Sequence, residues 1–446
     1  MIQAIQANPV VVGGDEELLF CGPASLTRGA FRQRVAVLAA RLPEARHVVN
    51  LCEGRDDFIL GFCAALLRGQ VTLLPPSRAP DVVDEVAMRH PGSYRLGDAA
   101  TASTCDVRID QLLAAANAEA APEPSTDIPG ERLAMIGFTS GSTGTPSARA
   151  KTWGSLVHTN GANLCALADL FAGAAASIVA TVPPQHMFGM EMSVLLPLLG
   201  PFAVHPGRPF FPDDIARALG ECEAPRLLVT TPVHLRALIE AGIALPPLAA
   251  ITTATAPLPA ELARAAESRF DCEVRELFGA TEICIIASRR TAREETWRLY
   301  DDTRLHPVED GTRVERPSLA EAVQLADRVQ LVDGGRGFVL RGRQADLLEI
   351  AGKRASLGDL THRLLGISGV RDAAMVQAEA DAMGVARLIA IIVADAETSD
   401  ESILAALRQG TDPVFLPRRI IRVPALPRNE TGKLPREAVA ALLRRA

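Results

Sequence analysis

Residues 138–146 read Phe-Thr-Ser-Gly-Ser-Thr-Gly-Thr-Pro, and seven of these nine are glycine, serine or threonine. The apolar run Leu133–Phe138 leads into them, which predicts a buried strand that ends in a glycine- and hydroxyl-rich loop. Gly141 and Gly144 permit close backbone approach, so N–H groups and five hydroxyls can converge on an anion. No Gly-Lys-Ser/Thr follows, which excludes a Walker loop. The pattern favours another kind of phosphate-binding loop, and a solvated connection is the alternative.

Composition narrows the class of protein. A chain of 446 residues with 48% hydrophobic and 22% charged residues is typical of a soluble protein with two or three domains. A net charge of −7 and only two Trp and two Tyr disfavour binding to nucleic acid. Eight cysteines are scattered without a Cys-x-x-Cys pair, so we expect reduced core residues. We expect no secretory signal, no membrane span and a cytoplasmic location.

Strands and helices alternate through the first 280 residues. The expected strands are 48–52, 70–74, 133–138, 175–182, 226–231, 249–253 and 272–278. The expected helices are 24–42 with Ser25 as its N-cap, 56–67, one from Glu191, 233–240 and 258–270. We interpret residues 77–130 as variable connecting structure. Strand–helix–strand order predicts parallel crossovers and a doubly wound α/β fold. Ligand-binding loops would then lie at the carboxyl ends of strands, as 139–146, 184–189 and 279–282 do.

The pattern changes beyond residue 285. Residues 328–341 predict an antiparallel hairpin with a turn at Gly334-Gly335. A capped helix over 356–365, strands over 373–376 and 388–393, and a last helix from Arg436 follow. We therefore predict a large N-terminal domain, 1–341, and a small α+β C-terminal domain, 342–446, that can move independently.

A second motif, Phe278-Gly279-Ala280-Thr281-Glu282, combines groups suited to a nucleotide. An aromatic ring can stack on a base, a threonine hydroxyl can bond phosphate, and a glutamate can bind a divalent ion. Further motifs follow in order: Asp327, Gly342-Arg343, Gly352-Lys353-Arg354 and Gly432-Lys433. With the loop at 138–146, this ordered set resembles the adenylate-forming (AMP-binding) superfamily of acyl-CoA synthetases, aryl-CoA ligases, luciferases and peptide-synthetase adenylation domains. The resemblance extends from Val48 to the end of the chain.

The resemblance implies ATP and Mg²⁺ as cofactors and gives ATP-binding roles to the residues that match the motifs. The phosphate loop would comprise Thr139, Ser140, Gly141, Ser142, Thr143, Gly144 and Thr145. The remaining nucleotide-binding residues would be Ala254, Thr255, Ala256, Phe278 and Gly279 on the adenine side, Asp327 and Arg343 on the ribose side, and Arg354. The catalytic residues would be Lys433, Thr281, Glu282 and His186.

The resemblance also implies a two-step reaction. A carboxylic acid would be activated as acyl-AMP and then transferred to the phosphopantetheine thiol of an acyl carrier protein or of CoA. Thr281 would contact the α-phosphate, Glu282 would bind the metal, and His186 would lie near the acyl pocket. Metal and Lys433 would offset the charge that develops during adenylation. The C-terminal domain would rotate before the second step.

Three positions depart from the family pattern. Ser147-Ala148 stands where the phosphate loop usually continues with Lys-Gly, so the usual lysine is missing, and Arg149 or Lys151 could compensate. Ala345, followed by Asp346, occupies the hinge position, which is commonly acidic. Trp153 stands where a histidine is common.

The shortness of the chain and the pattern Thr145-Pro146…Lys151-x-Trp153-Gly154 resemble the compact AMP-ligases of aryl polyene (xanthomonadin-type) pigment clusters. Those enzymes load a hydroxybenzoate-like acid onto an acyl carrier protein, so an aryl acid and a carrier protein are the favoured substrates. One alternative is a medium-chain fatty acyl ligase that uses CoA or a carrier protein. Another is a non-catalytic homologue that binds a carrier protein.

Overall fold

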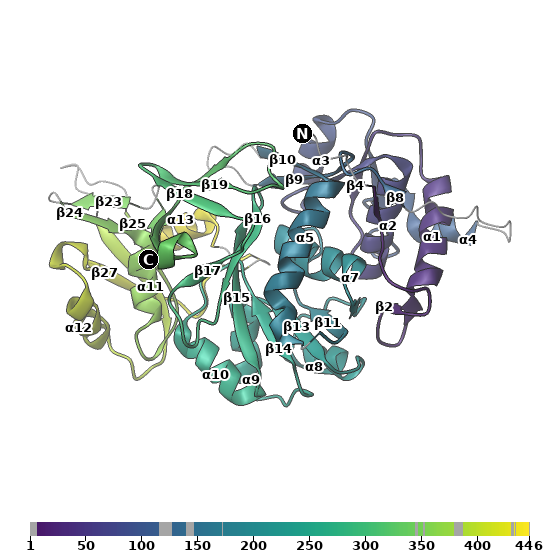
Figure 1. Ribbon diagram of the computed structural model, residues 1–446. Helices are drawn as coiled ribbons and strands as arrows, with labels where there is room; N and C mark the ends of the chain where they lie inside the picture. Colours follow the sequence, from purple (N-terminus) through teal and green to yellow (C-terminus); the bar gives the residue numbers. More distant parts are fainter. Residues whose placement is uncertain are drawn as a thin grey trace.

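The computed structural model describes residues 7–115, 127–139, 147–171, 173–343, 347–350, 353–378, 387–429, 432 and 434–445. A large N-terminal part and a small C-terminal part lie side by side (Figure 1). The predicted α/β class with two such domains is confirmed. The predicted boundary after residue 341 falls within strand β22, Gly337–Arg343, and stays a prediction.

The first sheet of the large part has, over the described residues, six strands in the order β10-β9-β5-β4-β6-β7. They are β4 His47–Asn50, β5 Val71–Leu74, β6 Tyr94–Gly97, β7 Val107–Arg108, β9 Leu133–Thr139 and β10 Ser147–Thr152. Helix α2, Arg55–Arg68, connects β4 to its parallel neighbour β5, as predicted. Strand β9 is parallel to β5, and β10 returns antiparallel beside β9. Residues 140–146 therefore join two adjacent strands of one sheet.

The interpretation of residues 77–130 as connecting structure is wrong. This segment contains helices α3, Pro80–Met88, and α4, Ile109–Ala114, and strands β6, β7 and β8, Asp127–Ile128, which pairs with β1, Asn8–Pro9. Strand β6 is parallel to β4 and so extends the sheet. Its sequence gives little signal because only alternate side chains, Tyr94 and Leu96, face the core while Arg95 pairs with Asp84.

The second sheet runs β21-β22-β17-β16-β15-β14-β13-β11-β12-β2-β3 over the described residues. Its strands are β2 Leu18–Phe20, β3 Leu26–Thr27, β11 Ala176–Ala180, β12 Phe202–Val204, β13 Arg226–Thr230, β14 Ala250–Thr253, β15 Glu273–Ala280, β16 Cys284–Arg289, β17 Trp297–Leu299, β21 Asp327–Val332 and β22. Neighbours from β12 to β15 are parallel, and those from β15 to β21 are antiparallel. The hairpin β21–β22 confirms the prediction, with Gly334 and Gly335 at positive φ in its turn.

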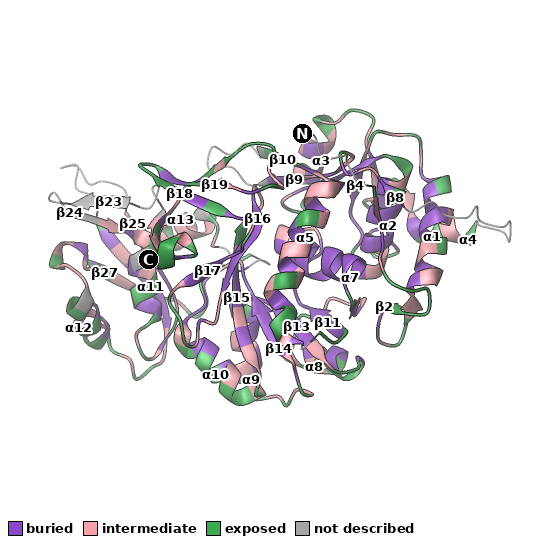
Figure 2. Ribbon diagram, viewed as in Figure 1, coloured by how far each residue is buried: buried purple, intermediate pink, exposed green. Residues whose placement is uncertain are grey.

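Helices cover both faces of the second sheet. Leu228 and Ile251 pack with α8, Pro212–Gly220, α9, Pro232–Ala241, and α10, Ala260–Phe270. Leu227 and Val229 point the other way and pack with α5, Trp153–Leu167, α7, Leu196–Leu199, and α1, Arg28–Arg41. The central strands are accordingly buried along their length (Figure 2). Because each parallel strand is apolar on both faces, the sequence shows continuous apolar runs, as expected for a doubly wound sheet.

Two helix starts and three cysteines differ from expectation. Helix α1 begins at Arg28, and Thr27 rather than Ser25 caps it by accepting the Ala30 amide at 3.3 Å, since the preceding residues pair as β3. The helix expected from Glu191 is already formed from Met187 as α6, Met187–Met190, and Glu191–Leu195 continues it as a π-helix. All eight cysteines are free, and five of them are buried as expected. Cys105 and Cys272 are half-buried, and Cys165 on α5 is exposed.

The small part has its own hydrophobic core. It contains β23 Leu347–Ile350, β24 Lys353–Ser356, α11 Leu357–Leu365, β25 Val370–Gln377, β26 Leu388–Ala394, α12 Asp400–Gly410, β27 Arg419–Arg422 and α13 Arg436–Arg445. The Ser356 hydroxyl accepts the Gly358 amide at 3.1 Å, which confirms the predicted capped helix. A further antiparallel sheet, β18 Arg304–Val308, β19 Gly311–Glu315 and β20 Val323–Leu325, lies before it in the chain. Across the described residues, every helix is too short or too polar to cross a membrane.

Candidate active site

The carboxyl-terminal end of strand β9 meets the segments that follow β11 and β15. Ligands of doubly wound folds bind at this edge of the sheet. His186, Thr281 and Gly137 line one small cavity of about 30 Å³ between the two sheets. A Cβ placed on Gly137 would lie 3.3 Å from the Thr281 methyl group, so β9 and Thr281 are in direct contact. The segment that carries Glu282 therefore lies beside the strand that leads into residues 140–146.

Two basic side chains of β10 contact Glu282. The Lys151 ammonium donates to the Glu282 backbone carbonyl at 2.6 Å, and the lysine side chain is almost completely buried. The Arg149 guanidinium Nη2 lies 3.5 Å from Glu282 Oε1, and this arginine is 42% exposed. Residues 149 and 151 lie on the same face of the strand because strand side chains alternate. Glu282 thus has one contact to its backbone and another to its carboxylate.

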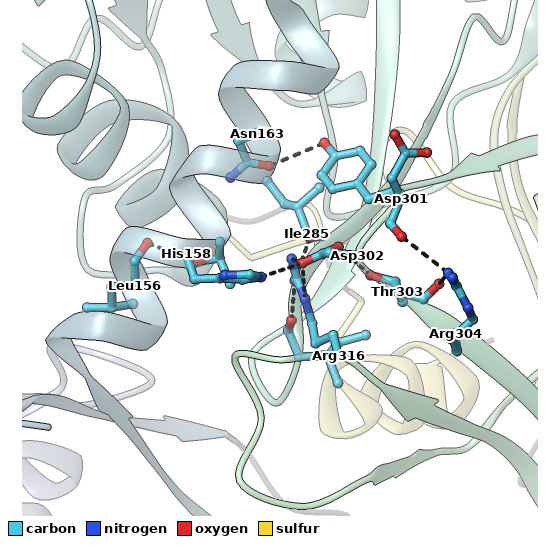
Figure 3. A network of polar contacts seen from close by, with 12 residues as sticks. Leu156, His158, Asn163, Ile285, Asp301, Asp302, Thr303, Arg304 and Arg316 are labelled. Carbon is cyan, nitrogen blue, oxygen red and sulfur yellow. Dashed lines mark hydrogen bonds and ion pairs between the residues drawn. The ribbon is translucent and has the colours of Figure 1, made fainter. Parts of the chain in front are cut away.

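Arg316 binds the backbone that follows Glu282, and Figure 3 shows it beside Ile285 and Asp302. Its Nη1 donates to the carbonyls of Ile283 and Ile285, both at 3.0 Å, while its Nη2 donates to Asp302 at 2.7 Å. His158 of α5 also contacts Asp302, at 3.0 Å, and ties the network to that helix. Burial raises the pKa of Asp302, but hydrogen bonds from Arg316 outweigh it, so the pKa lies below its ordinary value. The carboxylate is charged at neutral pH and pairs with a fully buried guanidinium.

Glu191 completes the support. Both oxygens of its carboxylate accept the Ile285 amide at 3.1 Å, and the Asn163 side chain donates to one of them at 3.1 Å. Tyr300 in turn donates to Asn163 at 3.2 Å. Desolvation raises the pKa of Glu191, which is 1% exposed, although these donors oppose the shift. Backbone groups from residue 282 to residue 285 are therefore fixed by side chains of three distant elements.

The backbone between these anchors is strained. Cys284 has a φ of +64°, a conformation that non-glycine residues rarely adopt. Such a residue persists only where its surroundings over-determine it, and such residues cluster at functional sites. The contacts to residues 282, 283 and 285 provide that constraint here.

The predicted adenine-side turn, Ala254–Ala256, follows β14 at the same edge of the sheet. Thr255 has a φ of +80°, which a β-branched residue rarely adopts, so its backbone is strained. Gly432 of the C-terminal part reaches this turn, because a Cβ placed on it would lie 3.7 Å from Thr255 and from Ala256. The residue next to Lys433 therefore lies against the turn that follows the carboxyl end of β14 in the large part.

Arg428 holds Gly432 in place by donating to its carbonyl at 2.9 Å. The same guanidinium makes a two-pronged ion pair with Asp372 of β25, at 2.7 and 2.8 Å. Beside them lies a cavity of about 410 Å³ between α9 and the C-terminal part, lined among others by Val233 and His234. The C-terminal part thus contacts the large part at Gly432, and the cavity separates the two parts beside this contact.

Phe278 and Asp327 lie where their strands end or begin. The Phe278 ring contacts Trp297 and Phe338 with centroid distances of 5.4 and 5.5 Å, so aromatic side chains occupy part of its surface. Asp327 starts β21 and pairs in register with Arg343 of β22. The two residues predicted to bind ribose are therefore neighbours across one hairpin.

Several predicted site residues lie wholly or partly outside the described residues. Ser140 to Thr145, Ala345, Asp346 and Lys433 lie wholly outside, and the side chains of Thr139, Arg343 and Arg354 are not described. Their roles stay predictions. Of the predicted residues that are described, His186 and Thr281 line the first cavity, and Glu282 follows Thr281 and contacts Arg149 and Lys151. Thr255 and Ala256 lie against Gly432.

Sequence reasoning missed the residues that support Glu282. Arg316, Asp302, Asn163 and Tyr300 match no motif, and nothing in their local sequence points to the site. Glu191 does carry a signal, because a single carboxylate within the apolar run Met190–Leu196 requires a buried partner.

Comparison with known proteins identifies the family. The model of the family described as AMP-binding enzyme matches residues 14–315, and that of the AMP-binding enzyme C-terminal domain matches residues 362–433. The chain is 30% identical over 298 residues to a 4-coumarate–CoA ligase of Rhodobacter capsulatus, covering 66% of this chain and 73% of that protein. It covers only 11–16% of the length of five further curated relatives.

Solved structures share the fold. ATP-bound MatB from Rhodopseudomonas palustris superposes with a TM-score of 0.79 at 17% identity and covers 96% of each chain. A benzoate CoA ligase from Burkholderia xenovorans superposes with a TM-score of 0.76 at 19% identity, over 95% of this chain and 96% of that chain. At these identities the likeness shows the fold alone. The family match covers more than half of the sequence, and the chain therefore belongs to the AMP-binding enzymes, the adenylate-forming family of acyl- and aryl-CoA ligases.

Proposed function

We propose that this chain uses ATP to convert a carboxylic acid into an acyl-adenylate and then transfers the acyl group to a phosphopantetheine thiol. One observation carries the proposal: Thr281 and Glu282 lie beside the strand that enters the phosphate-loop residues, and Gly432 contacts the strand ends of the same sheet. Lys433, the next residue, would then reach the site from the C-terminal part. Adenylation depends mainly on positioning and on neutralising charge, which such an arrangement provides.

The Glu282 side chain suits Mg²⁺. It is 21% exposed and presents one carboxylate beside the phosphate-loop strands. Mg²⁺ is usually bound by one or two carboxylates together with substrate phosphates and water. When bound, the ion would neutralise charge on the phosphates. Glu282 would hold it, Thr281 would bind the α-phosphate, and Asp327 would bind the ribose.

The acid is proposed to be aromatic, of the hydroxybenzoate type. The similarity to a 4-coumarate–CoA ligase over two thirds of the chain supports an aryl acid. The compact sequence pattern around Lys151 and Trp153 supports the same class and a carrier protein as acceptor. His186 and Thr281 line the small cavity where the carboxylate would lie. The alternatives are a medium-chain fatty acid with CoA or a carrier protein, and a homologue that binds a carrier protein without turnover.

ATP–pyrophosphate exchange with a panel of benzoates and fatty acids tests the proposal. Exchange with hydroxybenzoates is expected, whereas exchange with fatty acids alone would reject the aryl class. No exchange with any acid would favour the non-catalytic alternative. Intact-mass measurement of a phosphopantetheinylated carrier protein, run beside turnover of CoA, identifies the acceptor.

A further inference from the structure

Ser147 stands at the position after the phosphate loop where the family usually has a lysine. The cation that this lysine would give to the phosphates must therefore come from another residue. Two basic side chains follow on β10, at positions 149 and 151. The strand register pairs Arg149 with Gly137 and Lys151 with Met135 of β9. Both therefore lie on the face of the hairpin that meets Thr281, since Gly137 contacts this threonine.

Lys151 is committed to a structural contact. Its ammonium donates to the Glu282 carbonyl at 2.6 Å, and the side chain is 6% exposed. Moving this group to a ligand would leave the Glu282 carbonyl without its donor. Lys151 therefore orients the Glu282 backbone, and its ammonium is not available to bind the phosphates.

Arg149 is placed differently. It is 42% exposed, and its Nη2 lies 3.5 Å from Glu282 Oε1, beyond the roughly 2.7–2.9 Å of a tight charge-assisted hydrogen bond. Exposed pairs of this kind contribute little, so the guanidinium can leave the carboxylate readily. Its planar fork also matches two phosphate oxygens better than an ammonium does.

We infer that Arg149 supplies the missing cation and binds the β- and γ-phosphates of ATP. Without nucleotide, the guanidinium neutralises Glu282. With nucleotide, Glu282 would hold Mg²⁺, and Arg149 would move from the carboxylate to the phosphate oxygens. The inference rests on the proposed function, because it requires ATP to bind at Thr281 and Glu282.

Calorimetric titration with Mg·ATP and with AMP tests it without relying on turnover. Arg149→Ala should weaken ATP about 10-fold to 100-fold, as expected for a hydrogen-bonded charge, and leave AMP within twofold. The ATP affinity of Arg149→Lys should fall between those of the wild type and Arg149→Ala. Arg95→Ala is the matched control. Arg95 lies on β6 of the same sheet and forms a partly exposed pair with Asp84 of helix α3, so this variant should bind both nucleotides like the wild type.

Unchanged ATP affinity in Arg149→Ala would overturn the inference, and so would an equal loss for AMP, because AMP lacks the β- and γ-phosphates. Wild-type protein that binds neither nucleotide would instead reject the proposed function itself. Retained AMP binding in the variant also reports that it is folded.

A second measurement addresses the exchange of partners. In EDTA, Glu282→Gln removes the carboxylate that competes for Arg149, so metal-free ATP should bind about twofold to fivefold tighter than to the wild type. Part of this gain comes from lost repulsion alone. The gain should therefore shrink when the same change is made in the Arg149→Ala background, and an undiminished gain would contradict the exchange.

Discussion

The two sides of the site are built differently. On the Glu282 side, Lys151, Glu191 and Arg316 fix the backbone of residues 282–285 through buried hydrogen bonds. On the Gly432 side, Gly432 contacts Thr255 and is held by Arg428 and Asp372, next to a cavity of about 410 Å³. One side is part of a packed core, and the other is a contact between two parts that have separate cores.

This difference matches the two steps of the proposed reaction. The carboxylate that would hold the metal must stay in register with the phosphates, so a rigid, over-determined backbone suits it. Lys433 would be needed for adenylation and must leave before the thiol attacks, so a small contact suits it. The following tests break one side at a time.

The largest effect is expected from Arg316→Met, which breaks the Glu282 side. It removes four hydrogen bonds, two to the carbonyls of residues 283 and 285 and two to Asp302, and it leaves that largely buried carboxylate without its cationic partner Arg316. Losing one member of a buried ion pair typically costs about 3–5 kcal/mol, so the free energy of unfolding should fall by that order in urea titrations. Arg313→Met is the control, because Arg313 is 56% exposed and forms a surface pair with Glu315, and its loss should change stability by less than about 1 kcal/mol. Equal effects of the two would mean that the network is not a support.

Lys433→Ala tests the Gly432 side. Removing a donor that acts only in the transition state typically costs about 2.7–4 kcal/mol, so adenylation should slow by about 10²–10³-fold. Thioester formation from a supplied acyl-adenylate should proceed near the wild-type rate, since the lysine would then be withdrawn. Single-turnover measurement of each half-reaction separates the two steps. Equal loss of both would argue against a moving C-terminal part.

The titration of His234 reports whether water is excluded from the face of α9 that borders the cavity of about 410 Å³. Desolvation, with a smaller contribution from Arg208, lowers its pKa from 6.5 to about 4. Between those values the unfolded chain binds the proton and the folded chain does not, so stability should rise with pH from about 4 to 6.5. The change should be roughly 2–3 kcal/mol, and His234→Gln should flatten it. Unfolding midpoints across pH 4–7 measure this slope, and an identical slope in the variant would show that another group titrates.

The fold could be largely predicted because its strands are continuous apolar runs separated by amphipathic helices. Strand β9, the β4–α2–β5 crossover and the hairpin at Gly334-Gly335 follow from local sequence alone. Strand β6 was missed because a short strand with one polar side chain gives no run. The support of Glu282 was missed for another reason. Glu191 and Ile285 are 94 residues apart, and hydrogen bonds between buried polar groups depend on packing that no local pattern encodes.

The prediction for Arg149 and Lys151 shows the same limit within one strand. The sequence offered both as replacements for the missing loop lysine, and it could not rank them because they are two residues apart with similar charge. Burial separates them, since Lys151 is 6% exposed and Arg149 is 42% exposed. The roles of Lys151 and Arg149 thus depend on which atoms of Glu282 they contact, the backbone carbonyl or the carboxylate.

The smallest effect is expected from Arg428→Ala, which loosens the Gly432 side without touching Lys433. The change removes the donor to the Gly432 carbonyl and the ion pair with Asp372. In that pair the side chain of Arg428 is 17% exposed and that of Asp372 is 24% exposed. Because partly exposed pairs contribute roughly 1 kcal/mol, adenylation should slow by about fivefold. Thioester formation should change less, since the proposed rotation takes Gly432 away from Thr255. Arg422→Ala is the matched control, because Arg422 pairs with Asp400 on the far surface of the same C-terminal part and should leave both half-reactions unchanged. A loss confined to the thioester step would instead mean that Arg428 serves the rotated state, and the contact at Gly432 would then not be the one that positions Lys433 for adenylation.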